Sequence, residues 1–383
     1  PVAGFFDNYK IAAPSTATIL RQNGYHTAYF GKWHCGVVHD QKSKNVCDAG
    51  AEIYPGCCNR TPERHRAGFQ DWFGFENINS HFNSYYYENH NIVPTRLNGY
   101  ETDALTDLSI GYLEKYNRDE PLFMVLSVTP PHFPMIVPDK WKRFNPNGLQ
   151  VPPNFSDTPE MRDNLAIYYA MIENLDWNIG RLVEAIEALP AFRDTIFIYV
   201  SDHGDFMGSH GRALRKEYPH EESVRIPAIL KWPGHIPKLG TVPGLFSLVD
   251  LLPTTLGLVG IPIPEYVQGV DYSPQLFDLP FNAPDSVLLE MVGVPRWTLD
   301  YLDWRGIATY DWKYAFFESG EELLFDLRND PFEMNNLASK QSDIRVKMKI
   351  ALLTLLEQTR EPFFDVIMNY GAPMNQPDID VSK

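Results

Sequence analysis

The sequence has no apolar run long enough to cross a membrane, and it is short of positive charge. A membrane-spanning helix needs about 20 consecutive apolar residues, and no run in this 383-residue chain approaches that length. Lysine and arginine number 33 against 49 acidic residues, so the formal net charge is -16 at pH 7. Nucleic-acid binding depends on clustered lysines and arginines that neutralise phosphates. We therefore expect neither a membrane span nor a nucleic-acid partner.

Cysteine is scarce as well. The four cysteines match no zinc-site spacing, and a pairing of Cys47 with Cys57 or Cys58 is as compatible with the sequence as free buried thiols. No repeat or low-complexity tract is found. A chain of this length is too long for one simple core, so the composition predicts a soluble globular enzyme with two subdomains.

Three short apolar runs are each followed directly by a polar segment that contains histidine. The runs span residues 26–30, 122–128 and 195–200, and they are typical of buried parallel strands. Open α/β sheets bind ligands at the carboxyl ends of their strands, so the polar segments should meet there. These segments are Gly31-Lys32-Trp33-His34, Thr129-Pro130-Pro131-His132-Phe133-Pro134 and Ser201-Asp202-His203-Gly204-Asp205.

Together the three segments predict one site with two kinds of chemistry. Lys32, His34 and His132 would form a cationic pocket for a tetrahedral oxyanion such as sulfate or phosphate. Such a pocket stabilises negative charge that develops in a transition state. Asp202 and His203, in a loop with a flexible glycine, suit a metal ion or an anion.

Elsewhere in the first 285 residues the pattern continues an α/β arrangement. Residues 227–232 predict a further strand, and the order strand, helix, strand across residues 122–200 predicts a right-handed parallel crossover. Residues 39–100, rich in Asn, Tyr, His, Gly and Cys, are interpreted as a long irregular insertion. Helical spacing predicts helices over residues 14–23, 158–189 and 247–259.

Beyond about residue 285 the character of the chain changes. Strands are predicted over residues 302–317 and 322–327, with turns at Tyr310-Asp311 and Ser319-Gly320, and a helix over residues 342–358. We therefore divide the chain into a catalytic α/β domain, residues 1–285, and a small C-terminal α+β subdomain, residues 286–383. The last dozen residues are expected to lie on the surface or fray.

Five segments, in order from residue 14 to about 340, resemble motifs of the sulfatase family within the alkaline-phosphatase superfamily. The resemblance implies an α/β, alkaline-phosphatase-like fold: a central, mostly parallel sheet flanked by helices, with a smaller C-terminal antiparallel sheet plus a helix. The segments are Gly24-Tyr25-His26-Thr27 through His34, Pro131-His132-Phe133-Pro134, Ser201-Asp202-His203-Gly204, residues 215–227, and Leu324-Phe325-Asp326-Leu327 with Asp330-Pro331-Phe332-Glu333 and Asn336-Leu337-Ala338.

The resemblance also implies roles in binding and catalysis. Lys32, His34, His132 and Lys216 would contact the sulfate group, and the two lysines would offset its charge. Either His132 or Lys216 would protonate the leaving alcohol oxygen, which is general-acid work suited to these residue types. His220 stands where relatives often have tyrosine, and it would bind substrate or merely pack.

Asp202 and His203 would be metal ligands. Sulfatases typically hold calcium, a hard ion that prefers oxygen ligands. Histidine at position 203 is a softer donor than the asparagine of many relatives, so magnesium or manganese stays open.

Two elements of the family pattern are missing from the sequence. Relatives carry an adjacent Asp-Asp pair, and a Cys or Ser followed by x-Pro-x-Arg whose first residue becomes formylglycine, the nucleophile in its hydrated form. This chain has no Asp-Asp pair, and Cys57-Cys58-Asn59-Arg60-Thr61-Pro62 does not fit the spacing. Both elements normally precede Gly24, and Pro1 is an unusual start. We therefore expect an N-terminal truncation, with formylglycine and further metal ligands upstream.

The predicted function is hydrolysis of a sulfate ester, on a sulfated saccharide or another small sulfated molecule. Two alternatives stay open: a phosphodiester or phosphonate monoester hydrolase of the same superfamily, and a non-catalytic sulfated-glycan binder if the chain truly starts at Pro1. No signal peptide opens the sequence, but the resemblance implies a periplasmic, secreted or lysosomal enzyme. The sequence does not define the oligomeric state.

Overall fold

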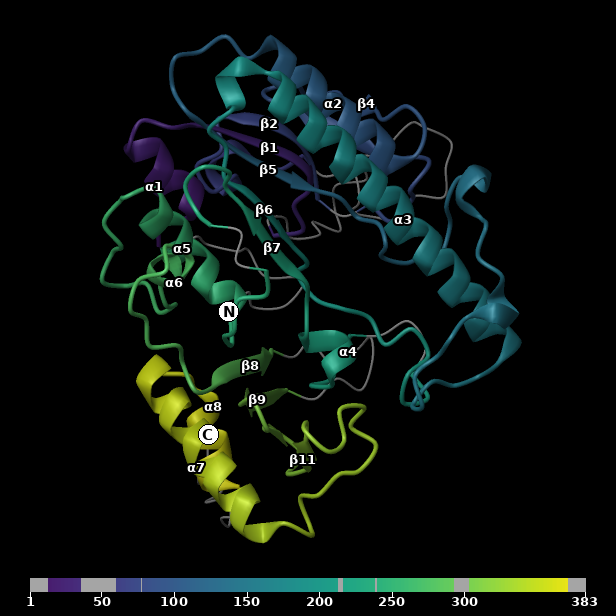
Figure 1. Cartoon of the computed structure of the whole chain (residues 1–383), viewed down its shortest axis with the longest axis vertical. Coiled ribbons are helices and arrows are strands. Elements are labelled where there is room, and N and C mark those ends of the chain that lie inside the picture. Colours follow the sequence, from purple (N-terminus) through teal and green to yellow (C-terminus); the bar gives the residue numbers. More distant parts are fainter. Residues whose placement is uncertain are drawn as a thin grey trace, which may run out of the picture.

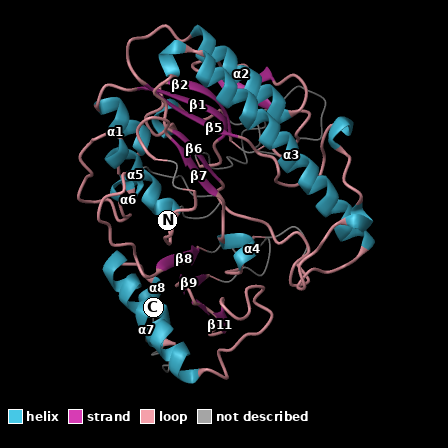
Figure 2. Ribbon diagram, in the orientation of Figure 1, coloured by secondary structure: helices cyan, strands magenta, loops and turns pink. Residues whose placement is uncertain are grey.

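The computed structural model describes residues 13–35, 60–76, 78–212, 216–237, 240–292 and 303–370. These residues form a larger α/β part and a smaller part in which one sheet carries two helices (Figures 1 and 2), so the predicted fold class is confirmed. Cys47, Cys57, Cys58 and the last dozen residues lie outside the described residues. Within these ranges, no helix has both the length and the apolar character needed to cross a bilayer.

The central sheet is built around β1 (His26–Lys32), which is buried along nearly its whole length. It pairs in parallel with β2 (Asp71–Phe75) on one side and β5 (Leu122–Ser127) on the other. The polar His26 is tolerated inside the sheet because its ring is hydrogen-bonded to the Asp71 carboxylate at 2.8 Å. The strands predicted at residues 26–30 and 122–128 are therefore confirmed.

Helices cover both faces of the central sheet (Figure 1). α2 (Glu101–Lys115) packs on the face that carries Met124, and α3 (Pro159–Ala188) lies outside α2. On the other face, α1 (Thr16–Gln22) and α5 (Leu251–Leu258) pack around Phe123, with the short α6 (Ser273–Leu276) beside α5. Neighbouring residues of a strand point to opposite faces, so Phe123 and Met124 serve different cores.

The three predicted helices of this part are confirmed as α1, α3 and α5, whereas α2 was not predicted. α3 begins where the sequence indicates, with the Thr158 hydroxyl accepting a hydrogen bond from the Met161 N–H and proline at position 159. The pattern of α2 is obscured because four of its seven buried side chains are polar: Glu101, Thr102, Thr106 and Ser109.

The interpretation of residues 39–100 as an irregular insertion is wrong for its second half. β2 lies in the core of the central sheet, and β3 (Tyr85–Glu88) and β4 (Thr95–Arg96) extend the sheet by antiparallel pairing to give the order β4-β3-β2-β1-β5. These strands are short, and Asn-rich segments separate them, so no long alternating pattern marks them in the sequence.

β6 (Phe197–Val200) and β7 (Ala228–Lys231) form a separate two-stranded ribbon. β6 is only half-buried and pairs antiparallel to β7. Residues 195–200 were predicted to form a buried parallel strand, joined to residues 122–128 by a crossover within one sheet. Both predictions are wrong for the described residues. Among these residues, β5 and β6 each have one edge that pairs with no other strand. The apolar run correctly indicated a strand, but tertiary contacts decide which other strand it pairs with.

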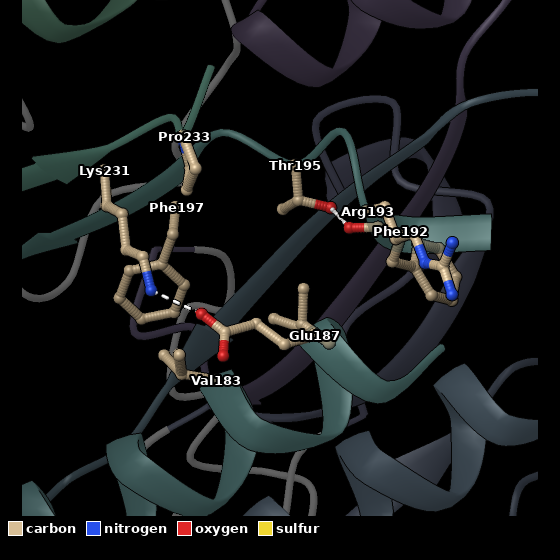
Figure 3. Close-up of a pocket in the computed structure, with 9 residues that line it drawn as sticks. Val183, Glu187, Phe192, Arg193, Thr195, Phe197, Lys231 and Pro233 are labelled. Carbon is tan, nitrogen blue, oxygen red and sulfur yellow. Dashed lines mark hydrogen bonds and ion pairs between the residues drawn. The ribbon is translucent and has the colours of Figure 1, made fainter. Parts of the chain in front are cut away.

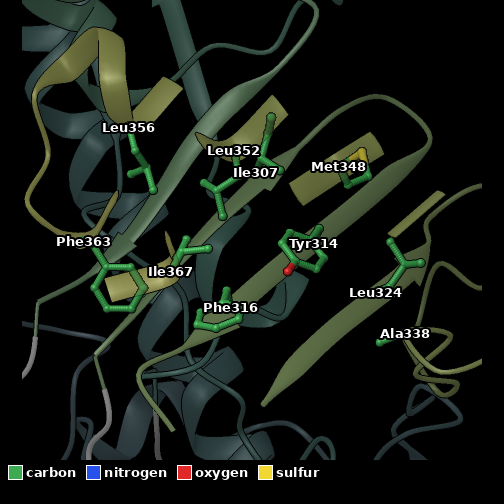
Figure 4. Close-up of a cluster of buried hydrophobic side chains, with 10 residues drawn as sticks. All are labelled: Ile307, Tyr314, Phe316, Leu324, Ala338, Met348, Leu352, Leu356, Phe363 and Ile367. Atoms are coloured by element: carbon green, nitrogen blue, oxygen red, sulfur yellow. The ribbon is translucent and has the colours of Figure 1, made fainter. Parts of the chain in front are cut away.

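The C-terminal sheet is antiparallel throughout and carries its helices on one face. Figure 4 shows side chains of the strands and helices meeting in one cluster, which includes Tyr314, Leu324, Leu352 and Phe363. The predicted strands, turns and long helix are confirmed, whereas β8 and α8 were not predicted; the boundary at residue 285 stays a prediction. The elements are β8 (Val287–Met291), β9 (Trp304–Ala308), β10 (Trp312–Phe317), β11 (Glu322–Asp326), α7 (Ser342–Thr359) and α8 (Phe363–Asn369).

Gly31 marks the tightest approach between β1 and β5 and provides a test of this packing. Its φ is +96°, and a Cβ atom there would lie 1.9 Å from the Ser127 carbonyl oxygen. Gly31→Ala should therefore lower the free energy of unfolding by about 2–5 kcal/mol, through the left-handed backbone and the clash together. Gly99→Ala is the matched control, since φ is +95° there but nothing lies within 4 Å of the added methyl group. Equal losses in urea unfolding of the two variants would contradict the close approach.

Candidate functional site

Four of the predicted site residues come together at the carboxyl end of the central sheet. Lys32 is the last residue of β1, and His34 follows with a left-handed backbone, φ 51°. The His34 side chain is partly exposed, but desolvation by the surrounding protein and the charges of Lys32 and Lys216 lower its pKa to about 3. Burial and the same two lysines lower the pKa of His132 to about 4. Charges shift a pKa in this way only at short range. The four side chains are therefore neighbours, and we call them the cationic group: Lys32, His34, His132 and Lys216.

The electrostatic state of this group suits an incoming anion. Both imidazoles are neutral near pH 7, while the two lysines supply positive charge. Burial lowers the pKa of Lys216, and the nearby carboxylates of Asp202, Glu217 and Asp205 oppose that effect. A bound dianion would raise the pKa of a neighbouring imidazole, so each histidine can take up a proton when the anion arrives.

The His132 ring is held in one orientation by its own loop. Its Nδ1 lies 2.7 Å from the Phe133 carbonyl oxygen, and a carbonyl can only accept, so Nδ1 carries the proton in the neutral ring. The Nε2 atom is then left to exchange a proton with a ligand. The backbone carbonyl of His132 accepts a hydrogen bond from His81 Nε2 at 2.8 Å. Nearby, the Thr129 N–H donates to Glu101 Oε1 at 2.9 Å.

His81 and Glu101 hold the loop of His132 by hydrogen bonds, and the sequence did not reveal either of them. Both side chains are fully buried, and Glu101 also accepts a hydrogen bond from the Ser84 hydroxyl at 2.6 Å. His81 lies 51 positions before His132 in the chain, within the stretch interpreted as an irregular insertion. No local spacing connects the two residues, so only the folded chain shows that they position this loop.

Asp202 and His203 follow β6 and lie beside the cationic group. The Nδ1–H of His203 donates to the Gly204 carbonyl oxygen at 2.8 Å, and its Nε2 lies 3.3 Å from Asp202 Oδ2. A carboxylate oxygen and an imidazole nitrogen this close can bind one cation, because metal–ligand distances of about 2.0–2.5 Å bring neighbouring ligands to about this separation. The Asp202 charge acts on the pKa of His34 and of Lys216, which places the pair next to both.

His220 lies apart from the cationic group, in a second polar cluster. It is 7% exposed, and its ring packs against the rings of Phe206, His210 and Phe325. Burial and the charges of His210 and Lys313 lower the pKa of His220 to about 3, so its main electrostatic neighbours differ from those of His34 and His132. The structure therefore favours packing over substrate contact for His220.

The same cluster contains a second set of possible metal ligands. Within the described residues, His210, Glu222 and Glu333 place one ligand atom each within 4.8 Å of one another. This set is separate from the predicted pair Asp202 and His203. The Lys313 ammonium already lies 2.8 Å from Glu333 Oε1 and supplies positive charge there.

A surface pocket at the C-terminal end of α3 contains none of the predicted site residues. In Figure 3, Lys231 reaches across to Glu187, with 2.5 Å between the ammonium and the carboxylate, and the Thr195 hydroxyl donates to the Phe192 carbonyl oxygen at 2.6 Å. The lining is largely apolar, and its only cationic groups are Arg193 and Lys231, the second of which is paired with Glu187. We therefore place the candidate site at the strand ends.

Comparisons with known proteins agree on one family. A family model described as Sulfatase matches residues 11–261, and a model described as N-sulphoglucosamine sulphohydrolase, C-terminal, matches residues 208–361. The chain is 31% identical over 377 residues to the ulvan-active sulfatase of Formosa agariphila, covering 95% of this chain and 70% of that protein. It is 26% identical over 378 residues to the endo-4-O-sulfatase of Bacteroides thetaiotaomicron, covering 90% and 73% of the two proteins.

The fold also matches a solved structure over most of its length. YidJ from Bacteroides fragilis has a TM-score of 0.82 and 28% sequence identity to this chain, covering 94% of this chain and 80% of that one.

Titration of the two histidines can test whether Lys216 lies close to both of them. Lys216→Met removes a positive charge close to both imidazoles, so the pKa values of His34 and His132 should rise from about 3 and about 4. Imidazole NMR chemical shifts recorded between pH 3 and pH 8 measure this directly. Lys140→Met is the matched control, because Lys140 lies over the rings of Trp141 and Trp177 and acts on neither shift. Histidine pKa values that do not move in Lys216→Met would contradict the placement.

Proposed function

This chain belongs to the sulfatase family and is a sulfuric ester hydrolase, and we propose that its substrate is a sulfate ester of a sulfated glycan. The names of the ulvan-active sulfatase and the endo-4-O-sulfatase support a saccharide substrate. The observation that carries the proposal is the group of two lysines and two neutral histidines at the strand ends. Polymeric sulfated glycans lie outside the cytosol, so we propose a periplasmic, secreted or lysosomal location.

The cationic group would bind the sulfate and assist departure of the alcohol. Lys32 and Lys216 would pair with its oxygens and offset their negative charge, and the imidazoles of His34 and His132 would donate hydrogen bonds to it once the anion has caused them to take up a proton. The leaving oxygen needs a proton as the S–O bond breaks. His132 Nε2 and the Lys216 ammonium are the two candidate donors, and the lowered pKa of Lys216 makes its proton easier to transfer.

Asp202 and His203 would hold a metal ion, with calcium as our first proposal and magnesium or manganese as the alternatives. Their ligand atoms lie 3.3 Å apart, and the Asp202 side chain is 82% exposed, which leaves room for additional oxygen ligands. When bound, the cation acts as a Lewis acid on an oxygen of the sulfate group. The Lys216 ammonium lies close to this pair and would repel the bound metal ion. The Asp202 carboxylate reduces that repulsion, because its negative charge also acts on Lys216.

The nucleophile is proposed to be a formylglycine on a segment that precedes the residues printed here. No Cys or Ser followed by x-Pro-x-Arg occurs in the sequence. The described edges of β5 and β6 that pair with no strand lie next to the loops of His132 and Asp202, and a strand placed there would end at the same site. In its hydrated form a formylglycine supplies the attacking oxygen. A phosphonate monoester or phosphodiester could occupy the same cationic group, so a substrate panel must decide between the two chemistries.

The identity of the general acid can be tested with leaving groups of different basicity. In the full-length enzyme, His132→Asn and Lys216→Met should each lower kcat on sulfated oligosaccharides by about 10²–10⁴-fold. Only the variant that lacks the acid should regain activity on an aryl sulfate, whose phenolate departs without a proton. His235→Asn, at an exposed ion pair with Asp194, is the control and should retain wild-type rates. Sulfate release is measured by ion chromatography.

Two results of this assay would contradict the proposed function. One is wild-type sulfate release by both His132→Asn and Lys216→Met. The other is faster turnover of phosphonate monoesters than of every sulfate ester tested, which would favour the alternative chemistry.

The metal assignment predicts a loss of bound ion in one variant. Asp202→Asn replaces a carboxylate by a neutral amide and should reduce the metal content of the purified enzyme to a small fraction of the wild-type value. Elemental analysis by mass spectrometry measures this, with kcat falling in parallel. Asp139→Asn, which changes a carboxylate at an exposed pair with Lys142, should leave both unchanged. Full metal content in Asp202→Asn would refute the assignment.

A further inference from the structure

A buried cluster of ion pairs on the C-terminal sheet binds the segment that follows Lys216. The Lys313 side chain, on β10, is 1% exposed, and its Nζ lies 2.6 Å from Glu221 Oε1 and 2.8 Å from Glu333 Oε1. The other oxygen of Glu333 accepts a hydrogen bond from the Glu221 N–H at 2.7 Å. Lys313 and Glu333 therefore hold both the side chain and the backbone of the first residue of α4 (Glu221–Val224).

Glu333 is delivered by the segment Asp330-Pro331-Phe332-Glu333, a family-like motif for which the proposed reaction gives no role. The Asp330 carboxylate accepts hydrogen bonds from the N–H groups of Met334, at 3.0 Å, and Asn335, at 2.8 Å. Asn336 Oδ1 accepts from the Leu324 N–H of β11 at 3.0 Å. These bonds fasten the turn to the C-terminal sheet, and Glu333 leaves it with a left-handed backbone, φ 51°.

On its other side α4 contacts both parts of the proposed active site. The Ser223 hydroxyl donates a hydrogen bond to the Lys216 carbonyl oxygen, and the Gly204 N–H donates to the Ser223 carbonyl oxygen at 2.8 Å. A Cβ atom on Gly204 would lie 2.0 Å from the Glu222 carbonyl oxygen. The loop of Asp202 and His203 is therefore packed directly on α4.

A second contact reinforces the link to Lys216. Trp304 Nε1–H, on β9, donates to the carbonyl oxygen of Glu217 at 2.8 Å. The neighbour of Lys216 in the chain and the helix that bonds to its carbonyl are thus both attached to the C-terminal sheet. In Figure 1, α4 lies between the central sheet and the strands β8, β9 and β11.

We propose that Lys313 and Glu333 are positioning residues through which the C-terminal subdomain sets the place of Lys216. The inference rests on the proposed function of Lys216. Two carboxylates share one buried ammonium, so removing Lys313 leaves them unbalanced and repelling. α4 then loses its fixed position, and Lys216 moves relative to the sulfate group. A displacement of about 1 Å at a reacting group can lower a rate by about 100-fold.

The test is a double-mutant cycle in the full-length enzyme on a sulfated oligosaccharide, whose alcohol leaving group needs a proton. Lys313→Met should lower kcat by about 10–100-fold with a smaller change in KM, and Lys313→Arg should restore part of the loss. In a Lys216→Met background, Lys313→Met should have no further effect on kcat, because it acts through Lys216. Lys349→Met is the control: its ammonium lies over the Phe316 ring on the same sheet and is 31% exposed, so kcat should stay unchanged.

Three results distinguish failure of this inference from failure of the proposed function. If Lys216→Met keeps wild-type kcat, the proposed function fails. If Lys216→Met is impaired while folded Lys313→Met keeps wild-type kcat, the positioning role fails alone. If Lys313→Met lowers kcat equally in both backgrounds, its effect is general structural damage and the inference is overturned. Should Lys313→Met not fold, Glu333→Gln takes its place in the same cycle, since it removes only the charge of the partner.

Discussion

The site depends on gathering positive charge in a protein that carries a formal net charge of -16. Two lysines cannot be buried side by side without cost, because each loses hydration and repels the other. The chain limits this cost by keeping His34 and His132 neutral and by placing Asp202 close to Lys216. A sulfate group that enters supplies the negative charge that the site lacks, so the cost of assembling the site favours binding of the substrate.

Two of the segments that form the site are each held by a buried polar pair from another part of the chain. Glu101 and His81 hold the loop of His132, and Lys313 and Glu333 hold the helix bonded to Lys216. These supports come from α2, from the turn before β3, and from the C-terminal sheet. Buried polar groups of this kind fix position well because any alternative arrangement leaves them unpaired. In the proposed account, the smaller subdomain contributes to the site through Lys313 and Glu333.

The sequence was sufficient where a residue's role depends on its neighbours along the chain. Lys32, His34 and His132 follow apolar runs that are strands, so their gathering at one edge could be predicted from strand polarity alone. The strand pairing of residues 195–200 was predicted wrongly, because an apolar run does not specify the strand beside it. β2 was missed since the strand is short and flanked by glycine and asparagine.

The supports could not be predicted for a different reason. His81 lies 51 positions from the carbonyl it contacts, and Glu333 lies 112 positions from the Glu221 N–H. Sequence patterns report periodicity over one element, whereas these contacts join separate elements. His220 shows the converse, because its position within a resembling motif left substrate contact and packing both open, and its contacts with Phe206 and Phe325 favour packing.

The most direct test of the anion site is proton uptake on binding of inorganic sulfate. Calorimetric titrations at pH 5 in buffers of different ionisation enthalpy report the number of protons bound with each sulfate. Because the folded pKa values of His34 and His132 are about 3 and about 4, both rings are neutral at this pH and should gain protons as the anion raises those values. We predict net proton uptake that disappears in the His34→Asn/His132→Asn variant. Sulfate binding without proton uptake, or with the same uptake in that variant, would contradict the account.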